Sequence, residues 1–345
     1  MERFEYFIRR LLLIVPTFLG ITIICFGLTQ IVPGGPVDQM IMRMRGVGSG
    51  ESAARGAAST ITEEYRKQLE QHYGFDRPIP VRYWNWLTGS RLGLDMESYK
   101  YPNKTAWQVI RDRFHISLIF GIAGFVLTYV VCVPLGIAKA LRQGSFFDLA
   151  SSLIVFAGYA MPAFALGMVL KMLLCGTVDG FWSVFPVAGF ESDGFRSMTF
   201  FQQVADRFHH MFLPVACYIA GNFAVLTLLM KNSLLDQIGS DYIRTVLARG
   251  GTFRRAIWGH AFRNALIPIA TGFGSILTLM FAGSVVIETV FEIPGMGRLS
   301  LEAIVGRDYP VFMATISITT VLGLLGNVLS DFCYVLIDPR INYRK

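Results

Sequence analysis

Histidines and carboxylates are the residues of this chain that could hold a metal ion or move a proton. The five histidines are His72, His115, His209, His210 and His260, and only His209 and His210 are neighbours in sequence. Adjacent residues on a helix point in different directions, so this pair is not expected to share a metal ion. The chain also lacks the H-E-x-x-H, G-x-S-x-G and G-x-x-x-x-G-K-[ST] motifs of zinc peptidases, serine hydrolases and nucleotide-binding loops. The sequence therefore predicts neither an enzyme nor a cofactor of its own.

Three charged residues, Lys171, Glu288 and Asp331, lie at the edges of long apolar runs. Charged groups inside a membrane span are functional candidates by default. Each of these lies close enough to the end of its run for the head group to reach the aqueous interface, so we interpret all three as structural. No run carries a carboxylate near its middle, which counts against proton coupling, although a sodium site built from carbonyl groups would leave no mark in the sequence. An ion-coupled secondary transporter stays the alternative, ahead of a membrane enzyme or scaffold.

The elements that must position any site are six apolar runs without a single charge. The chain has 345 residues, of which 53% are hydrophobic and 16% charged, and its mean hydropathy is +0.49. A helix rises about 1.5 Å per residue, so about 20 residues cross a hydrocarbon core of about 30 Å. Six such runs in one chain predict an all-α polytopic membrane protein with six transmembrane helices. The runs are Leu11–Val32, Ile116–Ala138, Leu149–Leu170, Met211–Met230, Ala265–Ile287 and Pro310–Ser330.

Proline and glycine inside these runs predict kinks. The residues in question are Pro16, Pro134, Pro162 and Gly272. In lipid, neighbouring helices can satisfy the backbone groups that a kink frees, so such residues are tolerated within a span.

The distribution of lysine and arginine predicts the orientation. With the N-terminus inside, segments 1–10, 139–148, 231–264 and 338–345 face the cytoplasm and carry 14 basic and 6 acidic residues. The outer segments carry 17 of each. Because cytoplasmic loops hold an excess of Lys and Arg, both termini are predicted to be cytoplasmic. The basic pI of about 9.2 is explained by loops that face anionic lipid and partners, and no nucleic-acid motif accompanies it.

The runs and loops predict four parts along the chain. Residues 1–32 are a cytoplasmic stub and a first helix, residues 33–115 an external segment, residues 116–337 a core of five helices, and residues 338–345 a cytoplasmic tail. The aromatic cluster of Tyr83, Trp84 and Trp86 in the external segment has two equal interpretations. It could lie at the membrane interface, where Trp and Tyr are enriched, or it could pack the external segment together.

The cytoplasmic loop 231–264 is far longer than a turn between two spans requires. Its apolar residues Leu235, Ile238, Tyr242, Val246 and Leu247 recur at helical spacing, with arginines elsewhere around the helix. The pair Gly250-Gly251 then ends the helix, and a second basic helical stretch follows. One interpretation is a helix that lies on the inner leaflet, and the other is a helix that docks into a cytoplasmic partner.

Two stretches around this loop resemble a known family. Tyr242–Gly250 followed by His260–Pro268 is similar to the cytoplasmic "EAA" loop of ABC importer permeases, in the variant of the dipeptide and oligopeptide B-type permeases. Gly283–Leu299 resembles the stretch that follows the fifth span in that family. Within the family the chain resembles the Yej-type B permeases for peptides and microcin C-like compounds. The stretches that carry this likeness are Val32–Gln39, His72–Ile79, Gly158–Phe164 and Lys231–Asp236, whereas Arg307–Val311 and Asp338–Ile341 fit the family as a whole.

The resemblance implies the fold and the assembly. The fold would be that of a type I importer permease (MetI-like), with an extra N-terminal helix and a periplasmic segment, in the bacterial inner membrane. The partners would be a second permease subunit, a cytoplasmic ABC ATPase that binds ATP and magnesium, and a periplasmic substrate-binding protein. Peptide import is favoured over import of nickel or sugars.

The resemblance also implies which residues couple the spans to the ATPase. The eponymous Glu-Ala-Ala is absent, and its place is held by Arg244-Thr245-Val246, so no contact of the family's glutamate is carried over. Gly250 is retained, and the second glycine, Gly251, is expected to loosen the turn. The predicted coupling residues are Tyr242, Arg244, Thr245, Val246, Ala248 and Gly250. Polar residues within the runs are possible pathway groups without an assigned role, because helix-to-helix hydrogen bonds explain them equally well; they are Asn222, Thr227, Ser275, Thr278 and Asn327.

Overall fold

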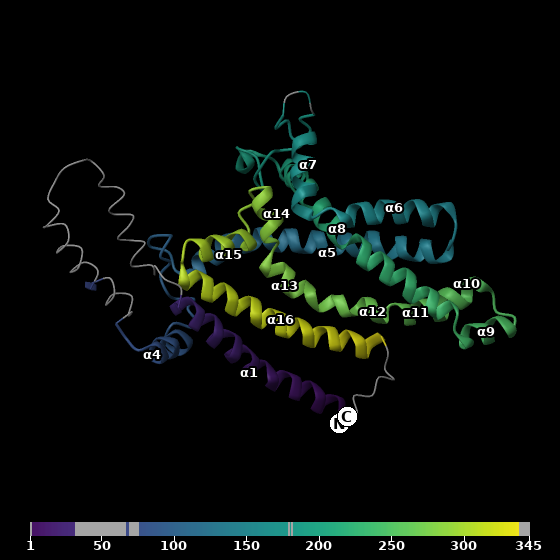
Figure 1. The fold of residues 1–345 in the computed structure, drawn as a ribbon, viewed down its shortest axis with the longest axis horizontal. Helices are drawn as coiled ribbons and strands as arrows, with labels where there is room; N and C mark the ends of the chain where they lie inside the picture. Colours follow the sequence, from purple (N-terminus) through teal and green to yellow (C-terminus); the bar gives the residue numbers. More distant parts are fainter. Residues whose placement is uncertain (1, 32–66, 69–75, 179, 181, 338–345) are drawn as a thin grey trace. The chain divides into compact units, whose positions relative to one another are not determined.

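The computed structural model describes residues 2–31, 67–68, 76–178, 180 and 182–337, and these are predominantly helical (Figure 1). Within these ranges there is no strand, only two isolated β-bridges. The all-α prediction is confirmed. The helices are α1 (Glu2–Ile31), α4 (Ile79–Trp84), η1 (Asn85–Gly89), α5 (Ala106–Leu141), α6 (Phe146–Ala160), α7 (Ala163–Leu174), η2 (Phe195–Ser197), α8 (Phe200–Ile238), α9 (Asp241–Ala248), α10 (Phe253–Ala256), η3 (Ile257–Ala261), α11 (Phe262–Ala265), α12 (Ile267–Ala270), η4 (Thr271–Gly274), α13 (Ser275–Ala282), α14 (Val285–Val290), α15 (Met296–Val305) and α16 (Tyr309–Ile337).

Four of the six apolar runs form continuous helices that are long and apolar enough to cross a membrane, namely α1, α5, α8 and α16. Pro16 and Pro134 lie inside α1 and α5, which continue past them. Helix α8 has 39 residues, which at about 1.5 Å per residue is about 58 Å, so it extends well beyond a hydrocarbon core of about 30 Å. Its C-terminal end therefore carries the first residues of the predicted loop 231–264.

The third run is not one straight helix. Helices α6 and α7 meet at an angle of 98° across Met161 and Pro162, and together they form a bent pair that could count as one span. Proline disfavours the helical conformation of the residue before it, and Met161 is extended, with φ −92° and ψ 122°. The prediction of a kink at Pro162 was too weak, because the chain breaks there and then starts a new helix.

The fifth run is broken into short pieces, α11, α12, η4 and α13, before α14 begins. A 3₁₀ turn over Thr271–Gly274 interrupts it, and Gly283, with φ +62°, separates α13 from α14. A side chain at Gly274 would overlap the backbone of Gly326 on α16, so two glycines bring these segments into close contact. The kink predicted at Gly272 is therefore a break, and the fifth run does not form one continuous helix.

The chain packs as two compact units. The first comprises residues 1–12, 113–298 and 321–345, and the second residues 13–112 and 299–320. This division differs from the predicted division by membrane side, which stays a prediction. Most of the predicted external segment before residue 76 and the tail 338–345 lie outside the described residues.

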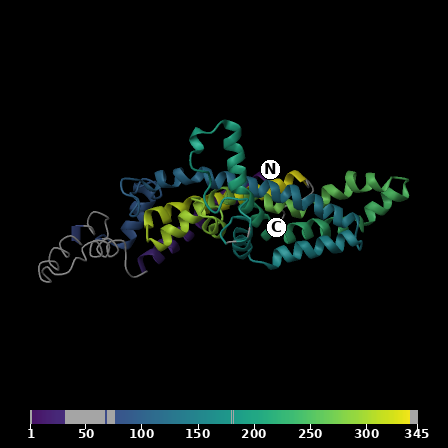
Figure 2. The same cartoon turned by 90° about the horizontal axis from the view of Figure 1, so that it is seen from above.

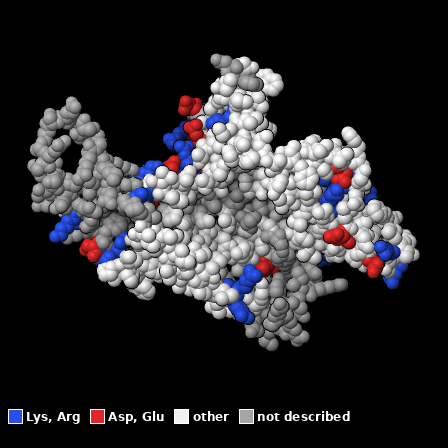
Figure 3. All heavy atoms as spheres, in the orientation of Figure 1, with Lys and Arg blue, Asp and Glu red and all other residues white. Residues whose placement is uncertain are grey.

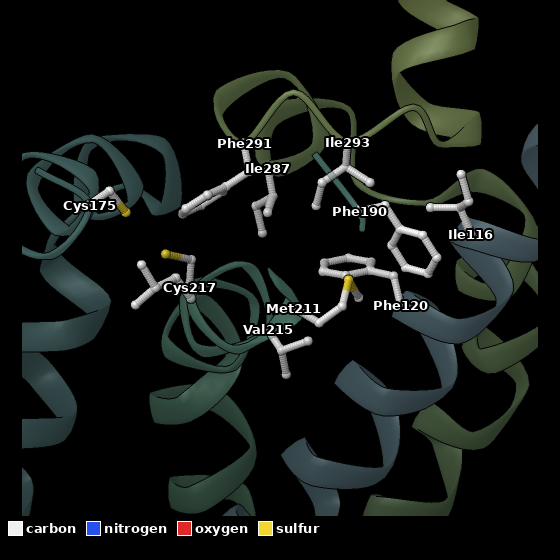
Figure 4. Close-up of a cluster of buried hydrophobic side chains, with 11 residues drawn as sticks. Ile116, Phe120, Cys175, Phe190, Met211, Val215, Cys217, Ile287, Phe291 and Ile293 are labelled. Carbon is white, nitrogen blue, oxygen red and sulfur yellow. The ribbon is translucent and has the colours of Figure 1, made fainter. Parts of the chain in front are cut away.

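The first unit is held together by a core of apolar side chains from α5, α7, α8 and α14 (Figure 4). Phe120 of α5 and Met211 of α8 face the segment that carries Ile287, Phe291 and Ile293. Helices α6 and α7 both pack on α8, so α8 is the central helix of this unit.

The second unit contains the aromatic cluster of the external segment. Tyr83 and Trp86 pack against Phe26 of α1, with ring centroids 5.4 and 6.3 Å away, whereas Trp84 is exposed. The packing interpretation therefore holds for two of the three aromatic residues. The same unit is closed by Asp308, whose carboxylate accepts a hydrogen bond from the Ser98 hydroxyl.

Candidate functional site

Helix α9 lies in the loop 231–264 and has a distinct cap at each end. It begins after Ser240, which is extended with φ −74° and ψ 153° and whose hydroxyl donates to the carbonyl of Gln237 at 2.5 Å. It ends at Ala248, and Gly250, with φ +82°, caps it by donating its N–H to the carbonyl of Leu247 at 3.0 Å. Only two residues separate α9 from α8, so a force on α9 reaches α8 directly.

The second glycine completes this helix end. The N–H of Gly251 donates to the carbonyl of Val246 at 3.0 Å, which together with the bond from Gly250 forms a Schellman motif. A Cβ at Gly251 would lie 2.8 Å from that same carbonyl oxygen. The expectation that Gly251 loosens the turn was wrong, because the absence of a side chain lets the backbone close.

One residue anchors α9 to the rest of the unit. Ile243 is 1% exposed and joins a core cluster with Ile137 of α5, Leu234 of α8 and Ile257. Val246, Leu235 and Ile238 pack partly against this cluster. The prediction that Tyr242 and Leu247 belong to the apolar face of this helix is therefore wrong. Tyr242 and Leu247 point away from the core and are 36% and 38% exposed.

The predicted coupling residues mostly form the outward face of α9. Arg244, Thr245, Ala248 and Gly250 are exposed, whereas Val246 is partly buried. The Arg244 guanidinium has a side-chain exposure of 75% and lies 3.5 Å from Asp241. Figures 1 and 2 show α9 and α10 at one tip of the first unit, and Figure 3 shows charged side chains gathered over that tip.

Tyr242 differs from the other predicted coupling residues because its hydroxyl hydrogen-bonds to two other parts of the loop. Its hydroxyl donates to the Gln237 carboxamide oxygen at 2.7 Å and accepts from the Asn264 carboxamide nitrogen at 3.2 Å. It thus bridges the end of α8 and the start of the next membrane segment. Sequence reasoning missed Gln237, Asn264 and Ile243; the spacing of Ile243 and Val246, three residues apart, was the available signal for the last.

A buried ion triad lies at the base of this loop. The Lys231 ammonium contacts both carboxylate oxygens of Asp148 at 2.8 Å, and the Lys139 ammonium lies 3.0 Å from the same carboxylate. Lys139 is fully buried and also donates to the hydroxyls of Ser151 and Ser152. The triad joins α5, α6 and α8 where the loop begins, and sequence reasoning did not foresee it.

The three charged residues at the run edges are all bound. Glu288 is 1% exposed and accepts from the Ser117 hydroxyl at 3.2 Å and from the backbone N–H of Arg298 at 2.8 Å. Lys171 donates to the carbonyl of Val290 at 2.8 Å, and Arg10 lies 2.7 Å from Asp331. Their structural role stays a prediction, and Glu288 is buried rather than solvated as that prediction assumed. Burial with hydrogen-bond partners replaces solvation there.

Comparison with known proteins decides the family. Residues 132–343 match the model of the family described as "Binding-protein-dependent transport system inner membrane component". The chain belongs to this family. It is 37% identical to the inner membrane ABC transporter permease protein YejB of Escherichia coli O157:H7, over 98% of both chains. It is 36% identical to the peptidoglycan transport system permease protein YejB of Agrobacterium fabrum, over 99% of this chain and 98% of the relative. It is 33% identical to the dipeptide transport system permease protein DppB of Escherichia coli K12, over 99% of both.

The range matched by this binding-protein-dependent permease family covers the site. The matched range begins inside α5 and includes the ion triad's Asp148 and Lys231, helix α9 and Glu288. A member is a membrane permease component of an ABC transporter and not an enzyme. The described site is a short exposed helix, which Ile243 anchors by burial and Tyr242 by hydrogen bonds.

Proposed function

We propose that this chain is the transmembrane permease subunit of an ATP-driven importer that carries peptides or peptide-like compounds, including those of the microcin C type, across the bacterial inner membrane. Relatives named as dipeptide, peptidoglycan and YejB permeases support this substrate class. The single observation that carries the coupling role is α9, which exposes Arg244, Thr245 and Ala248 while Ile243 is buried.

The proposed partners follow from the family and the charge distribution. A second permease subunit would complete the pathway, and a periplasmic substrate-binding protein would deliver the cargo. A cytoplasmic ABC ATPase would bind ATP and magnesium and would receive α9. Both termini would lie in the cytoplasm, in keeping with the excess of basic residues in segments 1–10, 139–148, 231–264 and 338–345.

The proposed mechanism uses α9 as a lever. When the ATPase moves α9, the load passes through Ile243 into the cluster with α5 and α8, and through Ser240 directly into α8. The Lys231–Asp148 ion pair, where the loop begins, makes α6 move together with α8. ATP and the loaded binding protein would each have to bind one state of the assembly better than the other, since only differential binding shifts the equilibrium.

Co-purification tests the docking role. A C-terminal tag on the full chain in native membranes is expected to retain a Walker-type ATPase, and Gly250→Asp is expected to lose it. Gly180→Asp is the matched control, because Gly180 also has a positive φ, at +92°, and open space around its Cβ, in a loop that the orientation places outside. If both variants keep or both lose the ATPase, α9 is not the docking site.

A further inference from the structure

A cavity of about 220 Å³ lies within the first unit, between α5, α8 and the broken fifth segment. Phe125 and Tyr129 of α5 line one side, Tyr218 and Asn222 of α8 another, and Gly272 of η4 a third. The cavity is lined without a single charged side chain. The cavity differs from the α9 surface in position and in chemistry, so the proposed docking of an ATPase on α9 does not account for it.

The cavity lies near mid-membrane depth. Tyr129, Asn222 and Gly272 each fall well inside a charge-free apolar run, at least seven residues from either end. The wall formed by α12 and η4 is discontinuous helix, and the carbonyl of Ile269 in that wall accepts a hydrogen bond from the Tyr129 hydroxyl at 3.3 Å. Broken helices at this depth recur where transport proteins bind their cargo, because they bring backbone polar groups into the pathway.

Asn222 is the informative residue of the lining. Its carboxamide nitrogen donates to the carbonyl of Tyr218 at 3.1 Å, while its carboxamide oxygen has no partner among the described residues. Asn222 is exposed in this chain, and an exposed amide at the centre of a membrane is costly unless it faces a polar path or a partner. The Tyr218 hydroxyl also has no hydrogen-bond partner in the described part of the chain.

We infer that this cavity is a subsite of the transport pathway that binds one uncharged amide unit of a peptide in transit. The Asn222 carboxamide oxygen accepts a peptide N–H, the Tyr218 hydroxyl donates to a peptide carbonyl, and the rings of Phe125 and Tyr129 cover the neighbouring side chain. Because the subsite carries no charge, it binds the backbone of the peptide and not its charged termini. Such binding suits peptides of varied sequence. This inference rests on the proposed function.

Uptake of two matched probes tests the subsite. Cells that depend on this importer are given tri-alanine or its analogue with both peptide nitrogens methylated, and the ratio of the two uptake rates is compared between variants. The binding protein is the same in every strain, so a change of ratio arises in the permease. Because one neutral hydrogen bond is worth about 1 kcal/mol, Asn222→Leu is expected to lower tri-alanine uptake about fivefold and uptake of the analogue less than about twofold.

Two further variants keep the test interpretable. Tyr218→Phe removes one hydroxyl and is expected to lower uptake of both probes about fivefold, because both retain the carbonyl that the hydroxyl binds. Asn327→Leu is the matched control, since Asn327 is an exposed amide on α16 outside the cavity lining, and its ratio is expected to equal that of the wild type. Immunoblots of membranes check that each variant is present.

The outcomes separate this inference from the function on which it rests. If the wild type accumulates tri-alanine and Asn222→Leu leaves the probe ratio unchanged, a lipid chain or a side chain of the partner permease occupies the cavity and the inference fails alone. If Asn327→Leu changes the ratio as much as Asn222→Leu, the effect is not specific to the cavity and the inference also fails. If the wild type accumulates neither probe, peptide import itself is wrong and the subsite falls with it.

Discussion

Truncation of Ile243 tests whether one buried side chain fixes α9 to the spans. Ile243→Ala removes about three carbon groups from a side chain that is 1% exposed. At about 0.8 kcal/mol per buried carbon group the lost transfer free energy is about 2.4 kcal/mol, and the cavity left behind adds to it. Since Ile243 makes the deepest contact of α9, we expect this loss to appear as local release of the helix.

Hydrogen exchange of the purified full chain measures that release. A loss of about 2.4 kcal/mol corresponds to about a 50-fold faster opening, since each 1.4 kcal/mol is a factor of ten. Mass spectrometry of peptides that cover Asp241–Ala248 should show this acceleration in Ile243→Ala. Exchange in the buried middle of α5 should not change.

Leu247→Ala is the matched control for this prediction. Leu247 lies on the same helix, is comparable in size and is 38% exposed, so its truncation should accelerate exchange much less. If Leu247→Ala accelerates exchange as much as Ile243→Ala does, or if neither variant changes it, then α9 is not held through Ile243. The proposed transmission of movement from α9 to α5 and α8 would then be contradicted.

Three other substitutions follow from the packing. Gly251→Ala should fray the end of α9 by about 1–3 kcal/mol, because its methyl group would press on the carbonyl oxygen that the backbone contacts; faster exchange of residues 246–251 would show it. Asp148→Asn leaves the buried Lys139 and the partly buried Lys231 without a counter-charge and should cost about 3–5 kcal/mol, seen as a lower melting temperature, whereas Asp236→Asn on the exposed face of α8 should be neutral. Glu288→Gln points an amide N–H at backbone donors and should lower the free energy of unfolding by about 1–3 kcal/mol. A melting temperature equal to that of Glu292→Gln, a substitution at an exposed site, would contradict this prediction.

The sequence was sufficient for the features that depend on composition and local chemistry. Long charge-free runs predicted helices, and α1, α5, α8 and α16 follow them because a helix satisfies its backbone hydrogen bonds within one segment. The end of α9 was also predictable, since Gly250 adopts a conformation that few other residues tolerate.

The continuity of helices and the long-range partners were not predictable. An apolar run around Pro162 or Gly272 is compatible with a kink or with a full break, and the choice depends on which neighbour packs there. The contact between Asp148 and Lys231 joins residues 83 positions apart, so no local pattern reveals it. The same holds for Ile243, whose burial depends on residues of α5 and α8.

Photo-cross-linking in native membranes tests the central claim most directly. A photoreactive phenylalanine analogue replaces Ala248 on the exposed face of α9 or, as a control, exposed Phe201 at the other end of α8. The account predicts an adduct with a Walker-type ATPase from position 248 and none from position 201. An ATPase adduct of equal yield from both positions, or none from position 248, would contradict the claim that α9 is where the permease receives the ATPase.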